Sequence, residues 1–180
     1  MTSIVVMVVG AMISHAPLPQ YKEIKSEILL EAVYEVFPKV DKSRVGVVVQ
    51  GARVGGWLGN IHPAWLIVMA YHESRMNPLA RGDCVRGKCK AYGLCQIHFH
   101  TGKSVMGGLT RAKLSRPIIN MIVAGLLYGK YIRKYGRKKA HVIYAGGGRC
   151  MTCTTTPSFR KRYKNMKKIL KIVSNLGVRK

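Results

Sequence analysis

Apolar side chains recur at three- and four-residue spacing in the middle of the chain, where Trp65 and Met69 follow Pro63. This spacing is typical of a helix, and a proline suits the first helical turn. Because Pro78 cannot continue a helix, the pattern predicts one over residues 63–75. The same periodicity predicts four further helices, over residues 21–37, 117–135, 138–145 and 157–175.

Two stretches lack this periodicity because glycine is frequent in them. Residues 46–59 contain five glycines and are interpreted as a loop with a short strand at 47–49. Residues 81–93 are interpreted as a turn or small hairpin, followed by a helix near Leu94. The predicted fold is therefore mostly helical (α+β), with one small hairpin.

The chain begins with an apolar run of ten residues at 4–13. This run is shorter than the roughly 18 residues that a membrane-spanning helix requires. Its length suits the core of a secretory signal, yet no Lys or Arg precedes it and Pro17 follows. A buried strand or short helix is the alternative, and both interpretations stay open. We expect three segments: an apolar leader or anchor-like segment at 1–20, an N-terminal helix and glycine-rich connection at 21–59, and one compact domain at 60–180.

Positive charge dominates the composition, with 31 Lys and Arg against seven Asp and Glu, a formal net charge of +24. Such a field would hold the protein against a polyanion. No helix-turn-helix, zinc-finger or aromatic-studded basic motif is present, so a specific nucleic-acid module is not predicted. Four glutamates spaced by four residues form a stripe on the first helix, which is either a solvated face or a clasp on the basic remainder: Glu23, Glu27, Glu31 and Glu35.

Glu73 and Asp83 are the only acidic residues after Asp41. Glu73 falls at the end of the apolar helix predicted over 63–75. Burial and the negative end of the helix dipole both disfavour a charged carboxylate there. These properties suit a general acid.

Four sequence blocks carry a resemblance to a known family. Glu73-Ser74 is followed by Asn-Pro-Leu-Ala at 77–80, by Gly-Leu-Cys-Gln-Ile at 93–97, by Pro-Ile-Ile-Asn at 117–120, and by Ile-Tyr-Ala-Gly-Gly at 143–147. Over about residues 60–170 the chain resembles the catalytic domain of the soluble lytic transglycosylases. These are relatives of goose-type lysozyme that cut the glycan strands of peptidoglycan. Two residues depart from the family pattern, Cys95 for Met and Ala145 for Asn.

The resemblance implies a lysozyme-like fold with a glycan-binding cleft. It implies that Glu73 cleaves the MurNAc-GlcNAc β-1,4 bond, first as acid and then as base, and leaves a 1,6-anhydroMurNAc end. It also implies a substrate-binding set with Tyr144 orienting Glu73 or the sugar: Ser74, Gly93, Leu94, Gln96, Ile97 and Tyr144. His72 and His98 match no family motif and are interpreted as structural or surface residues.

Two alternatives remain beside transglycosylation. Hydrolysis normally uses two carboxylates, about 5 to 9.5 Å apart, and only Asp83 could be the second one. The chain would then be a hydrolytic lysozyme. In the other alternative it is a non-catalytic, cationic component of a larger assembly. The shortage of acids favours the one-carboxylate reaction.

Five cysteines leave their chemistry open. Cys84, Cys89, Cys150 and Cys153 could form two disulfides in any of three pairings, stay as free thiols, or bind zinc as four thiolates, while Cys95 stands alone. Apart from that minor zinc possibility, no cofactor is expected. The expected partners are peptidoglycan, an anionic envelope surface and other proteins of a virion or a secretion or conjugation machine. The expected location is a phage virion or the bacterial periplasm and cell envelope.

Overall fold

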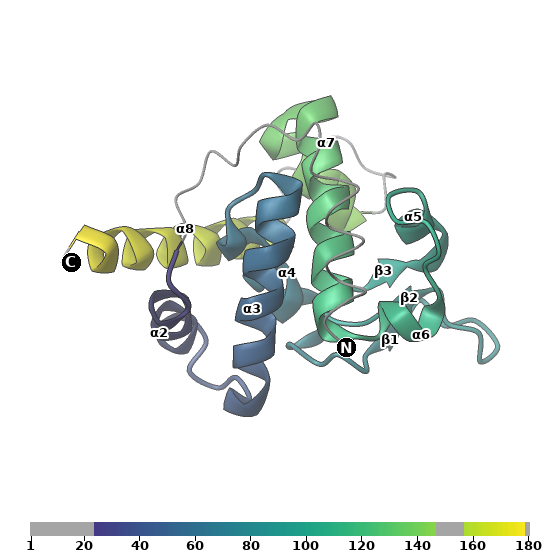
Figure 1. Ribbon diagram of the computed structural model, residues 1–180, viewed down its shortest axis with the longest axis horizontal. Coiled ribbons are helices and arrows are strands. Elements are labelled where there is room, and N and C mark those ends of the chain that lie inside the picture. Colours follow the sequence, from purple (N-terminus) through teal and green to yellow (C-terminus); the bar gives the residue numbers. More distant parts are fainter. Residues whose placement is uncertain (1–23, 147–156, 179–180) are drawn as a thin grey trace.

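The computed structural model describes residues 24–146 and 157–178. Figure 1 shows a mostly helical molecule with a small sheet, which confirms the predicted fold class. In this view the sheet, α5 and α6 lie to the right of α7, and α2 and α3 lie to its left. None of the described helices is long and apolar enough to cross a membrane. The elements are α2 (Ser26–Val36), α3 (Lys42–Gly59), α4 (Pro63–Ser74), β1 (Arg81–Gly82), β2 (Ala91–Tyr92), β3 (Ile97–His98), α5 (Phe99–Lys103), α6 (Arg111–Leu114), α7 (Pro117–Gly146) and α8 (Pro157–Val178).

The central packing contact is between α3 and α7, which run side by side in Figure 1. A Cβ atom built at Gly59 would collide with the Gly125 carbonyl oxygen, and one built at Gly125 would collide with the Gly55 carbonyl oxygen. Only glycine permits two helix backbones to approach so closely. The predicted loop and strand over residues 46–59 are therefore wrong. The glycines belong to a continuous helix and allow it to pack closely against α7.

Helix α4 lies inside the core, where every residue from Pro63 to Ala70 is buried. Its start is capped by His62, whose Nδ1 accepts a hydrogen bond from the Ala64 N–H at 3.1 Å. Its end is set by Arg75, which takes the left-handed conformation at φ 56°. The helix predicted over 63–75 is thus confirmed. Because it ends at Ser74, it delivers Glu73 from the core to the edge of the molecule.

The hairpin predicted over residues 81–93 is confirmed and is part of a three-stranded antiparallel sheet. Arg81 pairs with Tyr92 across β1 and β2, and Tyr92 pairs with Ile97 across β2 and β3. The helix predicted near Leu94 is wrong, because Gly93 at φ 73° and Gln96 at φ 46° both leave the right-handed helical region. The chain turns between them, and α5 begins only at Phe99.

The C-terminal half is formed by α7 and α8. Gly136, at φ 76° and ψ 161°, interrupts α7, so the two helices predicted over 117–135 and 138–145 are confirmed as two helical parts. One face of α8 is buried, with Met166, Ile169 and Val173 in the core. Helix α2 packs against α8.

Some predictions concern α2 or segments beyond the described residues. Glu27, Glu31 and Glu35 on α2 are exposed, as a solvated face requires. Glu23 and the predicted apolar leader at 1–20 lie outside the described residues. Cys150 and Cys153 do so as well.

Candidate active site

Glu73 lies in the last turn of α4, with 20% of its side chain exposed. Its Oε1 accepts a hydrogen bond from Nη1 of Arg162 at 2.5 Å, and the Arg162 side chain is only 11% exposed. Because its donor is charged, this hydrogen bond is stronger than one between neutral groups. Arg162 was not predicted from the sequence, although it lies four positions before Met166 and therefore on the buried face of α8.

Tyr144 connects α7 to the turn between β2 and β3. Its hydroxyl donates a hydrogen bond to the Cys95 carbonyl oxygen at 3.0 Å. Burial raises the pKa of Tyr144 well above its usual value, and the nearby Cys95 and Glu73 raise it further. Burial and Glu73 likewise raise the pKa of Cys95. Both groups therefore stay neutral, so the tyrosine beside Glu73 acts as a hydrogen-bonding group, and the buried thiol is not a nucleophile.

The turn between β2 and β3 is held by Asn120, a fully buried residue at the start of α7. Its Oδ1 accepts from the Cys95 N–H at 2.8 Å, and its Nδ2 donates to the carbonyl oxygens of Tyr92 at 2.9 Å and Leu114 at 2.8 Å. A Cβ atom at Gly93 would collide with the Asn120 carboxamide. The blocks at 93–97 and 117–120 therefore meet through a single side chain.

Like Tyr144, two further predicted substrate-binding side chains make internal hydrogen bonds. The Ser74 hydroxyl donates to the Ala70 carbonyl oxygen at 3.0 Å and accepts from the Asn77 N–H at 3.1 Å. Nε2 of Gln96 donates to the carbonyl oxygens of Ala80 at 3.1 Å and Gly93 at 2.9 Å. Both side chains thus shape the loops around Glu73, and a contact with substrate stays a prediction for each.

The other predicted contacts lie on the same turn. Leu94 and Ile97 are buried in the core, and Gly93 is buried beside Asn120. The side chains of Leu94 and Ile97 therefore anchor the turn to the hydrophobic core. A substrate contact through the backbone at 93–94 stays a prediction.

Histidines His72 and His141 lie around the Glu73–Arg162 pair and are neutral. Burial lowers the pKa of His72 to about 4, with Arg162 and two further cations contributing, and Nε2 of His72 lies 3.1 Å from Nδ2 of Asn165. Burial and then Arg162 lower the pKa of His141 to about 4. A neutral His72 accepts a hydrogen bond from the Asn165 amide, which fits the predicted structural role.

Asp83 has a different contact partner from Glu73. Its side chain is 63% exposed, and its Oδ2 lies 2.5 Å from Nε2 of His98. His98 is itself exposed, at 48% of its side chain. The structure thus pairs the second candidate carboxylate with a surface histidine on β3, while Glu73 is paired with Arg162.

The hairpin loop beside Asp83 is closed by a disulfide between Cys84 and Cys89. Cys95 is a free, buried thiol. Within residues 24–146 and 157–178, no group of three His, Cys, Asp or Glu side chains could hold a metal ion.

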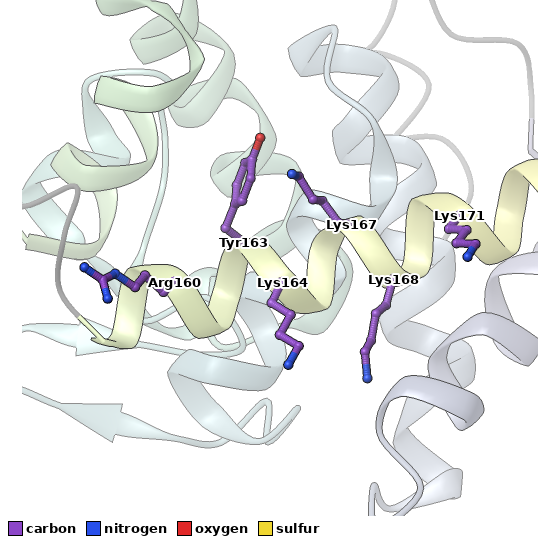
Figure 2. Close-up of a pocket in the computed structure, with 6 residues that line it drawn as sticks. All are labelled: Arg160, Tyr163, Lys164, Lys167, Lys168 and Lys171. Carbon is purple, nitrogen blue, oxygen red and sulfur yellow. The ribbon is translucent and has the colours of Figure 1, made fainter.

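The outer face of α8 carries an open groove, shown in Figure 2. Lysines and one arginine line it along the helix, and a tyrosine lies among them. The ammonium group of Lys167 lies 4.8 Å from the centre of the Tyr163 ring. We call this surface the basic groove. Its residues are Arg160, Tyr163, Lys164, Lys167, Lys168 and Lys171.

Comparison with known families places most of these residues in one module. The family model of the transglycosylase SLT domain matches residues 53–167. That span begins within α3 and ends within α8, so it includes both Glu73 and Arg162. No curated protein matches the chain in sequence.

Proposed function

The chain belongs to the transglycosylase SLT domain family, and on that premise we propose that it cleaves the MurNAc-GlcNAc β-1,4 bond with Glu73 as its only catalytic carboxylate. Members of this family are peptidoglycan lytic transglycosylases, which are enzymes. The observation that carries the proposal is the position of Glu73. It lies at the end of a buried helix, beside Tyr144 and Arg162, and the exposed Asp83 pairs with His98 instead.

The proposed reaction needs one carboxyl group used twice. Glu73 first donates its proton to the glycosidic oxygen as the bond from that oxygen to C1 of MurNAc breaks. The resulting carboxylate then takes the proton of the C6 hydroxyl while O6 bonds to C1. The product is a 1,6-anhydro ring, Glu73 is protonated again, and no water is consumed.

The surrounding residues have supporting roles in this proposal. Tyr144 holds the turn between β2 and β3 through the Cys95 carbonyl oxygen and places that turn beside Glu73. The backbone around Gly93 and Leu94 contacts an N-acetyl group of the glycan. Ser74 and Gln96 keep the loops on either side of the acid in place, because their hydrogen bonds join those loops.

Replacement of Asp83 by asparagine separates this reaction from hydrolysis. If Glu73 acts alone, we expect Asp83→Asn to release soluble fragments from purified peptidoglycan at a rate within about threefold of the wild type, because exposed ion pairs contribute little to stability. A hydrolase that used Asp83 as its base would lose about 10²-fold or more. The measurement is the initial rate of fragment release, with His98→Gln as the control for the lost ion pair. A loss confined to Asp83→Asn would contradict the proposal.

We also propose that the basic groove recruits the enzyme to the anionic cell envelope. Its five cations lie along α8 at positions 160, 164, 167, 168 and 171, and such a row of like charges attracts a polyanion. Stem-peptide carboxylates give peptidoglycan itself this charge. The groove runs along α8, the helix whose buried side holds Arg162 against Glu73.

Salt and charge removal test this recruitment. We expect Lys164→Gln with Lys168→Gln to weaken co-sedimentation with insoluble peptidoglycan by about two- to tenfold at low salt, with a smaller difference at high salt. The matched control removes two exposed lysines from α7, as Lys130→Gln with Lys139→Gln. An equal loss in both double variants would mean that net charge matters and the groove does not.

The biological setting is part of the proposal as well. Small lytic transglycosylases open the wall locally in secretion and conjugation machines and in phage particles. We therefore place the enzyme in a phage virion or at the bacterial envelope, alongside other proteins of such an assembly.

A further inference from the structure

The contact between Glu73 and Arg162 is not explained by stability. Both side chains are largely removed from water, and a buried ion pair often contributes no more than an apolar pair of the same volume. In addition, Nε of Arg162 is buried without a hydrogen-bond partner among the described residues. An unpaired buried donor is destabilising. An arginine in this position therefore needs a functional reason.

The position of Arg162 is fixed by the crossing of α8 over α4. The two helices pack together, and the Asn165–His72 contact lies about one turn of α8 beyond the Arg162–Glu73 contact. Two side-chain contacts on successive turns define one register between the helices. Arg162 is thus held against the carboxylate and does not sample solvent as a surface arginine does.

We propose that Arg162 is a positioning residue, because its guanidinium holds the Glu73 carboxyl group in one orientation. This inference rests on the proposed role of Glu73 as general acid. A charge-assisted hydrogen bond restricts the rotation of the carboxyl group. A misplacement of about 1 Å can cost a catalytic group about 10²-fold in rate. Loss of Arg162 should therefore lower kcat, while KM changes little.

None of the other described groups around the pair can replace Arg162. His72 and His141 on α4 and α7 have pKa values of about 4, so they are neutral above that pH. Tyr144 on α7 and Cys95 in the turn between β2 and β3 have raised pKa values and are neutral as well. The cationic side chains of Arg75 at the end of α4 and Lys161 on α8 are exposed. Arg162 is thus the buried cation that contacts Glu73.

Arg162→Met removes the charge and keeps an unbranched side chain of similar length. We expect kcat for fragment release to fall by about tenfold or more with KM within about twofold of the wild type, because the carboxyl group is no longer held in place. Arg162→Lys retains a charged donor and should recover most of the lost kcat. Circular dichroism checks that both variants are folded.

The split between kcat and KM decides the proposal. A kcat that is unchanged in Arg162→Met, or that falls equally in Arg162→Lys, would overturn it. If Arg162→Met does not fold, Arg162→Gln makes the same comparison, because its side chain is shorter and carries no charge. Failure of the proposed function would look different, since the wild type itself would then release no fragments at any pH.

Discussion

Glu73→Gln is expected to slow the release of soluble fragments from peptidoglycan by about 10²–10⁴-fold, the usual contribution of a positioned acid–base group. An amide cannot protonate the leaving glycosidic oxygen and cannot take the proton of the C6 hydroxyl. It can, however, still accept the hydrogen bond from Nη1 of Arg162. The variant should therefore fold normally and bind peptidoglycan while losing turnover, which initial rates on purified peptidoglycan measure.

A matched charge change on the surface controls for net charge. Glu31→Gln removes one carboxylate from the exposed face of α2 and should leave the rate within about twofold, since exposed substitutions rarely perturb a fold. A folded Glu73→Gln variant with more than a tenth of the wild-type rate would show that another group supplies the proton. A wild type that binds peptidoglycan and releases nothing would instead support the non-catalytic binding role.

Asn120→Ala is expected to give the largest loss of stability, about 3 kcal/mol or more in the free energy of unfolding. The substitution leaves the Cys95 N–H and the carbonyl oxygens of Tyr92 and Leu114 buried without their partner. Each unsatisfied buried group costs about 1–3 kcal/mol. Urea unfolding followed by circular dichroism measures the change.

The control for Asn120→Ala is the same substitution at an exposed asparagine. Asn175 is exposed on α8, so Asn175→Ala should change the free energy of unfolding by less than about 0.5 kcal/mol. Comparable losses in the two variants would mean that the hydrogen bonds of Asn120 do not hold the turn between β2 and β3. Since that turn lies beside Glu73, we also expect Asn120→Ala to lose activity at temperatures where it is still folded.

Helices that are rich in apolar side chains and are bounded by proline or glycine could be predicted from the sequence. This holds for α4, between Pro63 and Pro78, and for the two parts of α7 separated by Gly136. Helix α3 could not be predicted in this way. Its glycines lower helix propensity, and their value comes only from the close approach of α7 at Gly125, which is a tertiary contact.

The residues of the candidate site, too, could be predicted from the sequence only in part. Glu73 could be predicted because acidic residues are rare after Asp41 and because it lies at the end of an apolar helix. In the structure Tyr144 lies near Glu73, and its hydroxyl is hydrogen-bonded to the turn between β2 and β3. Arg162 could not be singled out in the sequence, because one arginine is not distinctive in a helix with many basic residues. Its place on the face of α8 that includes Met166 and Ile169 was the available sign, since a charge in an apolar stripe needs a partner.

The chemical nature of the new glycan ends tests the central claim most directly. Purified peptidoglycan is digested with the wild-type enzyme in isotopically labelled water, and the released muropeptides are weighed by mass spectrometry. If Glu73 acts as the single catalytic carboxylate, the muramic ends are 1,6-anhydro sugars, each lighter than a hydrolysed end by one water molecule and free of label. Reducing muramic ends that carry oxygen from the labelled water would contradict the account and would identify a hydrolase.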